Sequence, residues 1–169
     1  HTGRRWLYIL VLAFSFSALT TPLCRMLATR LGLVDNPSGH KIHKEPTPLL
    51  GGAAVFLGFF LPLLINGIFS REFGAILLCS MTLFVLGVLD DTLNLKAHVK
   101  LIVQIVLAVG LTFVGVRIVL VPETVLLGSI VNRLLSVIWI VGITNAMNFF
   151  DGMDGLAAGL AAIVSFFLA

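Results

Sequence analysis

The fold of this chain is decided by an apolar stretch that ends on two aspartates, residues 73–91, which read FGAILLCSMTLFVLGVLDD. Residues 73–89 contain no charged side chain. An α-helix needs roughly 17–25 consecutive apolar residues to cross the hydrocarbon core of a bilayer. The stretch therefore predicts a membrane-spanning helix that ends at Asp90 and Asp91.

The composition of the whole chain also indicates a membrane protein. Of its 169 residues, 59% are hydrophobic and 11% are charged, whereas about 25% of the residues of a soluble domain carry a charge. The formal net charge of +3 is too small to indicate binding to nucleic acid. Cys24 and Cys79 lie in separate apolar stretches and form no metal-binding motif. We therefore expect the lipid bilayer, and no nucleic acid, as a partner.

Further apolar stretches predict about six spans in a single integral membrane domain, residues 1–169. None shows the period-2 alternation of a membrane barrel, so the fold class is an all-α, polytopic transmembrane helix bundle. The predicted spans cover residues 6–24, 47–69, 73–89, 97–116, 134–150 and 155–169. Because the sixth is incomplete, we expect the chain to be truncated at its C-terminal end. Between Arg117 and Arg133 we expect an interfacial helix or a hairpin.

Six spans would place three polar segments on one side of the membrane: residues 25–48, 90–100 and 151–154. Basic residues are more frequent in cytoplasmic loops than in external ones. That side holds six basic residues against five on the other, so we assign it to the cytoplasm. The two sets are Arg25, Arg30, Lys41, Lys44, Lys96 and Lys100 against Arg4, Arg5, Arg71, Arg117 and Arg133.

Two clusters of aspartates follow membrane spans on this side, Asp90 with Asp91 and Asp151 with Asp154. Adjacent carboxylates repel each other unless a cation or a proton is shared, and the C-terminal end of a helix dipole disfavours an anion. A divalent cation would relieve both effects, and Mg²⁺ is commonly held by carboxylates together with substrate phosphates. The alternative is that the aspartates are N-caps of the helices that follow.

Two amides precede the second cluster. Asn145, Asn148, Asp151 and Asp154 recur at every third position, so they share one side of a helix for as long as the helix continues. Hydrogen bonds between helices in lipid would explain the amides alone. The added aspartates favour a functional site.

The loop before the second predicted span, residues 35–48, reads DNPSGHKIHKEPTP. His40 and His43 lack a third ligand for zinc. The loop is interpreted either as ordinary interfacial basic residues or as a cationic surface for phosphate groups.

Three segments together resemble the polyprenyl-phosphate N-acetylhexosamine-1-phosphate transferases, which form glycosyltransferase family 4. They are residues 43–52 (HKEPTPLLGG), 87–95 (GVLDDTLNL) and 145–156 (NAMNFFDGMDGL). Within this family the chain is most similar to the UDP-N-acetylglucosamine–undecaprenyl-phosphate GlcNAc-1-phosphate transferases. The family's usual fold has ten or eleven spans, so the chain resembles its N-terminal part.

The resemblance implies transfer of N-acetylhexosamine 1-phosphate, with GlcNAc as the expected sugar, from a UDP-sugar to polyprenyl phosphate. UMP would be released, and the product would start a cell-envelope polysaccharide such as lipopolysaccharide or teichoic acid. Mg²⁺ is the implied cofactor, with Mn²⁺ as its substitute. The implied catalytic residues are Asp90, Asp91 and Asp151, the metal ligands Asp91, Asp151 and Asp154, and the substrate-binding residues His43, Lys44, Lys100, Asn145, Asn148 and Asp154.

The resemblance further implies the bacterial inner (plasma) membrane, with the active site on its cytoplasmic face and a homodimer as one candidate assembly. Two alternatives remain open at this point. The chain could be a non-catalytic fragment or subunit that binds polyprenyl phosphate. It could also be an ion-coupled transporter, although a transporter predicts acids near the middle of a span, whereas these acids lie at span ends.

Overall fold

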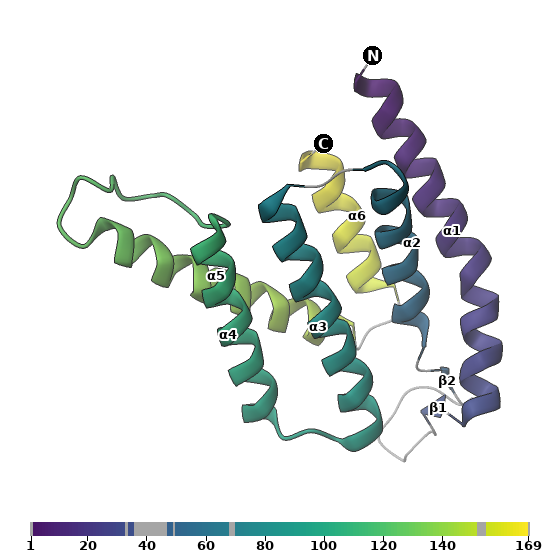
Figure 1. The fold of residues 1–169 in the computed structure, drawn as a ribbon. Helices are drawn as coiled ribbons and strands as arrows, with labels where there is room; N and C mark the ends of the chain where they lie inside the picture. The colour runs from purple at the N-terminus through teal and green to yellow at the C-terminus, as the bar shows by residue number, and fades with distance from the viewer. Residues whose placement is uncertain are drawn as a thin grey trace. The chain divides into compact units, whose positions relative to one another are not determined.

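The computed structural model describes residues 2–32, 34–35, 47–48, 50–67, 70–151 and 155–168. Across these residues the chain forms six helices and one pair of two-residue strands (Figure 1). In chain order the elements are α1 (Thr2–Leu31), β1 (Val34–Asp35), β2 (Thr47–Pro48), α2 (Gly51–Ile65), α3 (Arg71–Leu93), α4 (Ala97–Val114), α5 (Gly128–Phe150) and α6 (Leu156–Leu168).

Four of these helices are long and apolar enough to cross a membrane: α1 over Leu7–Leu31, and the whole of α3, α4 and α5. The helices α2 and α6 are apolar but shorter. Most large apolar side chains on the helices are exposed rather than packed inside the protein, as a surface in contact with lipid requires. The predicted all-α, polytopic membrane class is confirmed.

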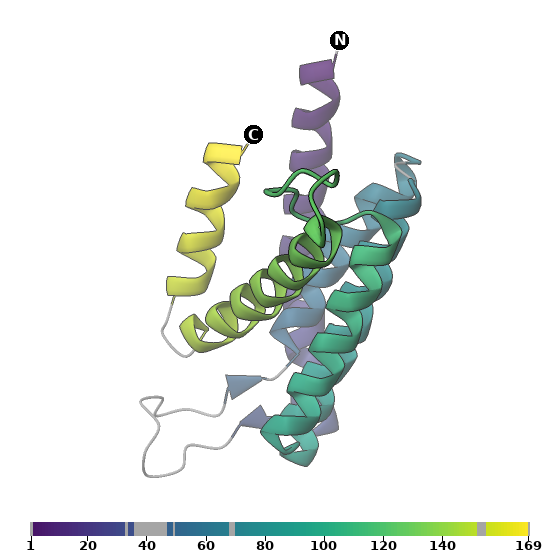
Figure 2. The ribbon, with the colours of Figure 1, turned by 90° about the vertical axis from the view of Figure 1, so that its left-hand side faces the viewer.

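The chain packs as two units, residues 1–97 and residues 98–169. In the first unit α1 and α2 lie side by side (Figures 1 and 2). Gly58 of α2 makes this approach close, because a Cβ atom at Gly58 would lie 2.7 Å from the Cβ of Ser17. The ring of Phe56 on α2 stacks on Phe84 of α3, with 5.2 Å between the ring centroids. A small antiparallel pair, with Val34 opposite Pro48, lies between α1 and α2 in the chain.

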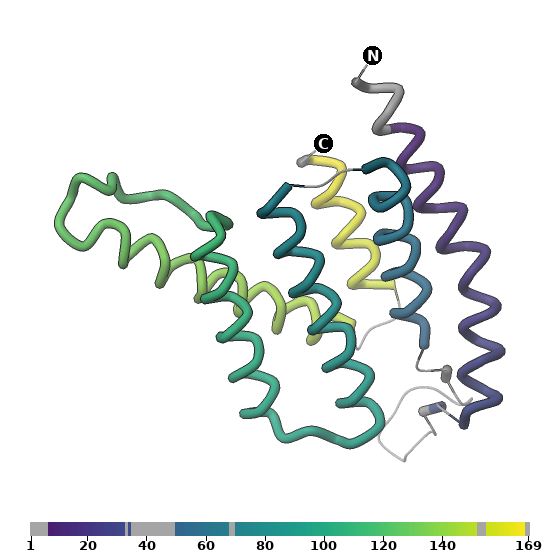
Figure 3. The backbone as a smooth tube through the Cα atoms, viewed as in Figure 1, coloured from purple at the N-terminus to yellow at the C-terminus, as the bar shows by residue number. Residues whose placement is uncertain are grey.

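In the second unit, α5 crosses α4 obliquely (Figures 1 and 2). A connection over residues 115–127 leads from α4 to α5, and Figure 3 traces it as a long excursion of the backbone. This connection forms turns and extended backbone, rather than the expected interfacial helix or hairpin. Three of its backbone N–H groups, those of Ile118, Leu120 and Val121, donate to side chains of α5.

Helix ends differ from the predicted spans where local chemistry overrides hydropathy. α1 continues past residue 24 through Arg25 and Arg30, since no residue stops it before Gly32, whose φ of +68° favours glycine. α3 continues through both aspartates to Leu93 and ends at Asn94 in the left-handed conformation. α5 begins at Gly128, before the predicted residue 134.

Candidate functional site

Asp90 shapes the end of α3. Its side-chain Oδ1 accepts a hydrogen bond from the backbone N–H of Leu95, at 3.1 Å. Its carbonyl oxygen accepts another from the N–H of Asn94, at 2.8 Å. Asn94 has φ +49°, a conformation that asparagine tolerates better than most residues. The half-buried Asp90 therefore helps to end α3 and to hold the turn toward α4.

Asp91 is exposed in the same last turn of α3. Successive residues of an α-helix point about 100° apart, because the helix has 3.6 residues per turn. The two carboxylates therefore leave the helix in different directions, and that of Asp90 accepts the Leu95 amide. Because α4 begins only at Ala97, the N-cap interpretation does not apply to this pair.

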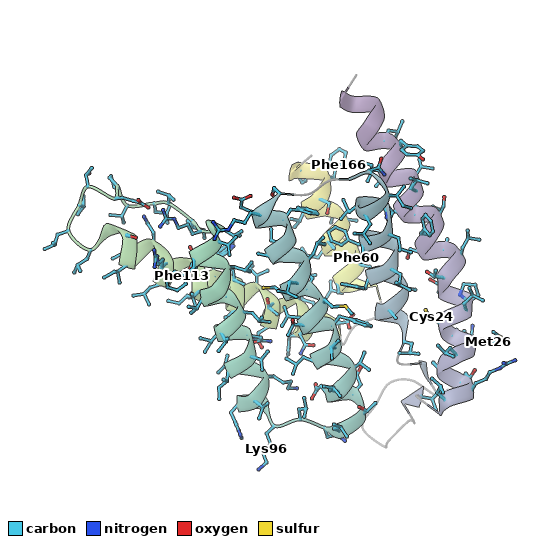
Figure 4. All side chains as sticks on the ribbon, in the orientation of Figure 1. Cys24, Met26, Phe60, Lys96, Phe113 and Phe166 are labelled. Atoms are coloured by element: carbon cyan, nitrogen blue, oxygen red, sulfur yellow. The ribbon has the colours of Figure 1, made fainter. Side chains whose placement is uncertain are left out.

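Lys96 and Lys100 follow this turn. Lys96 is exposed and points away from the ribbon in Figure 4. Lys100 lies in the first turn of α4 and is half-buried. Gln104 follows Lys100 by four positions, so both side chains lie on the same side of α4.

The C-terminal end of α5 carries the predicted amide and aspartate face. The helix is unbroken to Phe150, and the N–H of Asp151 still bonds the carbonyl oxygen of Met147, at 3.1 Å. Helical geometry thus persists as far as Asp151. Asn145, Asn148 and Asp151 are all exposed, so their polar atoms are presented at the surface of the second unit.

A side-chain hydrogen bond connects this face to α4. Asn145 Nδ2 donates to Gln104 Oε1 at 2.6 Å, and also to the carbonyl oxygen of Val141 at 2.8 Å. Gln104 is a residue that the sequence interpretation missed. The available signal was a polar amide within an apolar span, one turn beyond Lys100. The bond brings the amide-rich end of α5 to the side of α4 that carries Lys100.

The predicted site residues thus fall into three groups. Asp90 and Asp91 belong to the first unit, while Lys100, Asn145, Asn148 and Asp151 belong to the second. His43, Lys44 and Asp154 lie outside the described residues. Among the residues that are described, no group of three or more His, Cys, Asp or Glu side chains is placed to hold a metal ion.

The sequence profile described as glycosyl transferase family 4 matches residues 73–169, which include α3, α4, α5 and α6. No solved structure matches the chain.

Several curated relatives match most of the chain. A probable undecaprenyl-phosphate N-acetylglucosaminyl 1-phosphate transferase of Bacillus subtilis is 39% identical over 91% of this chain and 46% of its own length. A decaprenyl-phosphate N-acetylglucosaminephosphotransferase of Mycobacterium tuberculosis is 38% identical over 83% of this chain and 39% of its own. An undecaprenyl-phosphate alpha-N-acetylglucosaminyl 1-phosphate transferase of Thermotoga maritima is 33% identical over 88% of this chain and 47% of its own length. This chain spans less than half the length of these relatives. Because the family profile covers more than half of the chain, and it does so across the helices that carry the aspartates and amides, the chain belongs to glycosyl transferase family 4.

Proposed function

We propose that this protein transfers N-acetylglucosamine 1-phosphate from UDP-N-acetylglucosamine to polyprenyl phosphate, such as undecaprenyl phosphate, and releases UMP. The names of the relatives from Bacillus subtilis and Thermotoga maritima support this choice of acceptor and sugar. The chain's membership of the family supports the reaction class.

One structural observation carries the proposal for this chain's own residues. The exposed Asn145, Asn148 and Asp151 lie at the end of a span, and Gln104 connects them to the side of α4 that bears Lys100. Amides and an ammonium group bind phosphate oxygens, and a span end is where a lipid phosphate meets the water phase. The acceptor's prenyl tail needs lipid, whereas its phosphate and the nucleotide sugar need water, and a site at span ends serves both.

The proposed transfer is a displacement at phosphorus. An oxygen of the polyprenyl phosphate attacks the sugar-linked phosphorus and forms a new P–O bond. The bond from that phosphorus to the oxygen bridging toward the uridine breaks, and UMP leaves with this oxygen and the bond's electron pair. The product is polyprenyl-diphospho-N-acetylglucosamine.

The aspartates of α3 have separable roles in this proposal. The carboxylate of Asp90 accepts a hydrogen bond from the Leu95 amide, whereas Asp91 is exposed. Asp91 is therefore the better candidate to position or deprotonate the lipid phosphate, while Asp90 holds the turn beside it. Lys100 would bind the acceptor phosphate, as would His43 and Lys44, while Asn145 and Asn148 would orient the nucleotide sugar.

The carboxylates fit a hard divalent cation. Asp91 and Asp151 are exposed at span ends and offer the oxygen ligands that Mg²⁺ or Mn²⁺ takes together with substrate phosphates. We propose that these two residues and Asp154 hold the ion. When bound, the ion would neutralise charge on the diphosphate.

The remaining proposals concern the cellular setting. The protein would lie in the bacterial inner (plasma) membrane with its site on the cytoplasmic face, where nucleotide sugars are found. Its product would start a lipopolysaccharide, a teichoic acid or another envelope polysaccharide. A homodimer is the proposed assembly.

The proposal is tested with the purified full-length protein, UDP-N-acetylglucosamine and undecaprenyl phosphate. UMP should form together with an equal amount of lipid-linked diphosphosugar when Mg²⁺ is present, and neither should form after chelation by EDTA. Binding of undecaprenyl phosphate without release of UMP would contradict the transferase and would favour a binding subunit.

A further inference from the structure

We infer that the connection between α4 and α5, residues 115–127, is embedded in the interfacial layer of the bilayer, at the end of α5 remote from Asp151. The inference is independent of the proposed reaction. We call this segment the α4–α5 loop. It follows α4 and precedes α5, both of which are long and apolar enough to cross a membrane, so it must lie near a membrane surface.

The side chains of the loop suit lipid better than water. Residues 116–127 read VRIVLVPETVLL, whereas a loop on a water-facing surface is usually rich in polar residues. The side chain of Leu126 is 89% exposed and that of Leu120 is 72% exposed. Val119, Val125 and Leu127 are exposed as well. An exposed apolar surface of this kind is typical of a site that contacts a membrane or another protein.

The two charged side chains of the loop compensate each other. The guanidinium of Arg117 pairs with the carboxylate of Glu123, with 2.5 Å between Nη2 and Oε1. The guanidinium of Arg133 lies over the ring of Phe113, 4.5 Å from its centroid, and Figure 4 labels Phe113 near the end of α4 where the loop begins. The loop itself therefore has no net charge, and Arg133 of α5 is a neighbouring cation at its base.

Four backbone groups in the first half of the loop bond two side chains of α5. Ser136 Oγ accepts the N–H of Ile118 at 2.8 Å. Asn132 Oδ1 accepts the N–H groups of Leu120 and Val121 at 3.1 and 3.0 Å, and Asn132 Nδ2 donates to the carbonyl oxygen of Val121 at 2.8 Å. Both Asn132 and Ser136 are completely buried. Irregular backbone is tolerated at membrane depth only when its polar groups are paired within the protein.

The second half of the loop is also folded onto itself. The carbonyl oxygen of Pro122 accepts the N–H of Val125 at 3.0 Å, and that of Val125 accepts the N–H of Gly128 at 2.9 Å. Leu127 adopts a left-handed φ of +67°, and Gly128 lies so close to the Pro122 carbonyl that no Cβ atom would fit. The loop thus exposes large apolar side chains while several of its backbone polar groups are paired within the protein.

These observations favour lipid as the occupant of this surface. The apolar side chains continue the apolar surfaces of α4 and α5. The Arg117–Glu123 pair and the hydrogen bonds to Asn132 and Ser136 reduce the number of polar groups that would require water. A second copy of the chain is the competing occupant.

The position of the loop can be measured by fluorescence quenching in the full-length protein. Cys24 and Cys79 are replaced by alanine, and Leu126→Cys receives an environment-sensitive nitrobenzoxadiazole label. The protein is reconstituted in vesicles of phosphatidylethanolamine and phosphatidylglycerol. Quenching by nitroxide-bearing lipids should exceed quenching by iodide, present on both sides of the membrane, at least threefold. Lys96→Cys, in the exposed turn between α3 and α4, is the control and should show the reverse order.

Two results would overturn the inference. Iodide quenching at residue 126 equal to that at residue 96 would place the loop in water. Protection from both quenchers would place a second copy over it. Val119→Cys, on the first half of the loop, gives an independent reading, so a local disturbance at residue 126 cannot produce the result alone.

Discussion

Asn145 of α5 donates a hydrogen bond to Gln104 of α4 at 2.6 Å, across 41 positions of the sequence. The bond joins two spans that cross obliquely (Figure 1). Because Gln104 follows Lys100 by four positions, the bond lies on the side of α4 that carries Lys100. Asn145 also keeps a bond to its own helix, to the Val141 carbonyl. Gln104 thereby orients the first amide of the face that continues to Asn148 and Asp151.

Gln104→Leu should lower kcat/KM for UMP release about tenfold. The bond itself contributes little to stability, because hydrogen bonds between membrane helices average about 0.6 kcal/mol. The loss should therefore come from a misplaced Asn145 rather than from unfolding. Steady-state kinetics, measured together with a thermal melt of the same variant, distinguish a misplaced Asn145 from unfolding. Ile105→Ala, an exposed change on the same helix, is the control, and unchanged kinetics in Gln104→Leu would remove Gln104 from the site.

Asp90→Asn and Asp90→Ala should differ in stability. Asparagine keeps an oxygen that can accept the Leu95 amide, whereas alanine leaves this amide without its side-chain acceptor. A hydrogen bond of this kind is worth about 1 kcal/mol, so the thermal midpoint should fall in Asp90→Ala and stay near the wild-type value in Asp90→Asn. Equal midpoints for the two variants would show that the turn does not depend on this side chain.

Asn132→Ala should destabilise the second unit strongly. It removes the partners of three backbone groups of the α4–α5 loop, the N–H groups of Leu120 and Val121 and the Val121 carbonyl. Each unpaired buried group costs roughly 1–3 kcal/mol. Thr144→Ala is the control, because the Thr144 hydroxyl bonds only its own helix, at the Ile140 carbonyl. A thermal midpoint in Asn132→Ala no lower than in this control would contradict the described packing.

Gly58→Leu should separate α1 from α2. The Cβ atom of the added side chain would lie 2.7 Å from the Cβ of Ser17 and 3.0 Å from the Ala13 carbonyl oxygen. This oxygen belongs to the backbone of α1, so relieving the clash would require the helix to move. Overpacking of this kind typically costs about 1–3 kcal/mol. Gly74→Leu provides the matched control, since a Cβ atom there meets nothing within 4 Å. The thermal midpoint should be lower in Gly58→Leu than in Gly74→Leu. Equal midpoints in the two variants would contradict the close approach of α1 and α2.

The helical class was predictable from the sequence. Charged residues separate apolar stretches that are long enough to cross a membrane, and such stretches specify membrane helices by composition alone. The ends of the helices were not predictable, because they depend on single contacts. α3 passes through Asp90 and Asp91, and it stops where Asn94 turns left-handed and Asp90 bonds Leu95. α5 begins early because Gly128 fits against Pro122.

The candidate site was predictable in part. The spacing of Asn145, Asn148 and Asp151 placed them at one helix end, and the structure confirms that the helix continues to Asp151. The structural difference between Asp90, which accepts the Leu95 amide, and the exposed Asp91 was not predictable, because it depends on the turn that follows them. Gln104 was missed because its importance lies in a partner 41 positions away.

The central claim is that the exposed carboxylates at the ends of α3 and α5 carry phosphoglycosyl transfer. The most direct test measures Mg²⁺-dependent UMP release by Asp91→Asn and Asp151→Asn in the full-length protein, with Glu72→Gln as the control at the other end of α3. We predict a loss of at least about 100-fold in both variants, about 2.7 kcal/mol of transition-state stabilisation, with an unchanged thermal melt and near-normal turnover in Glu72→Gln. Near-normal turnover in either aspartate variant would contradict the account.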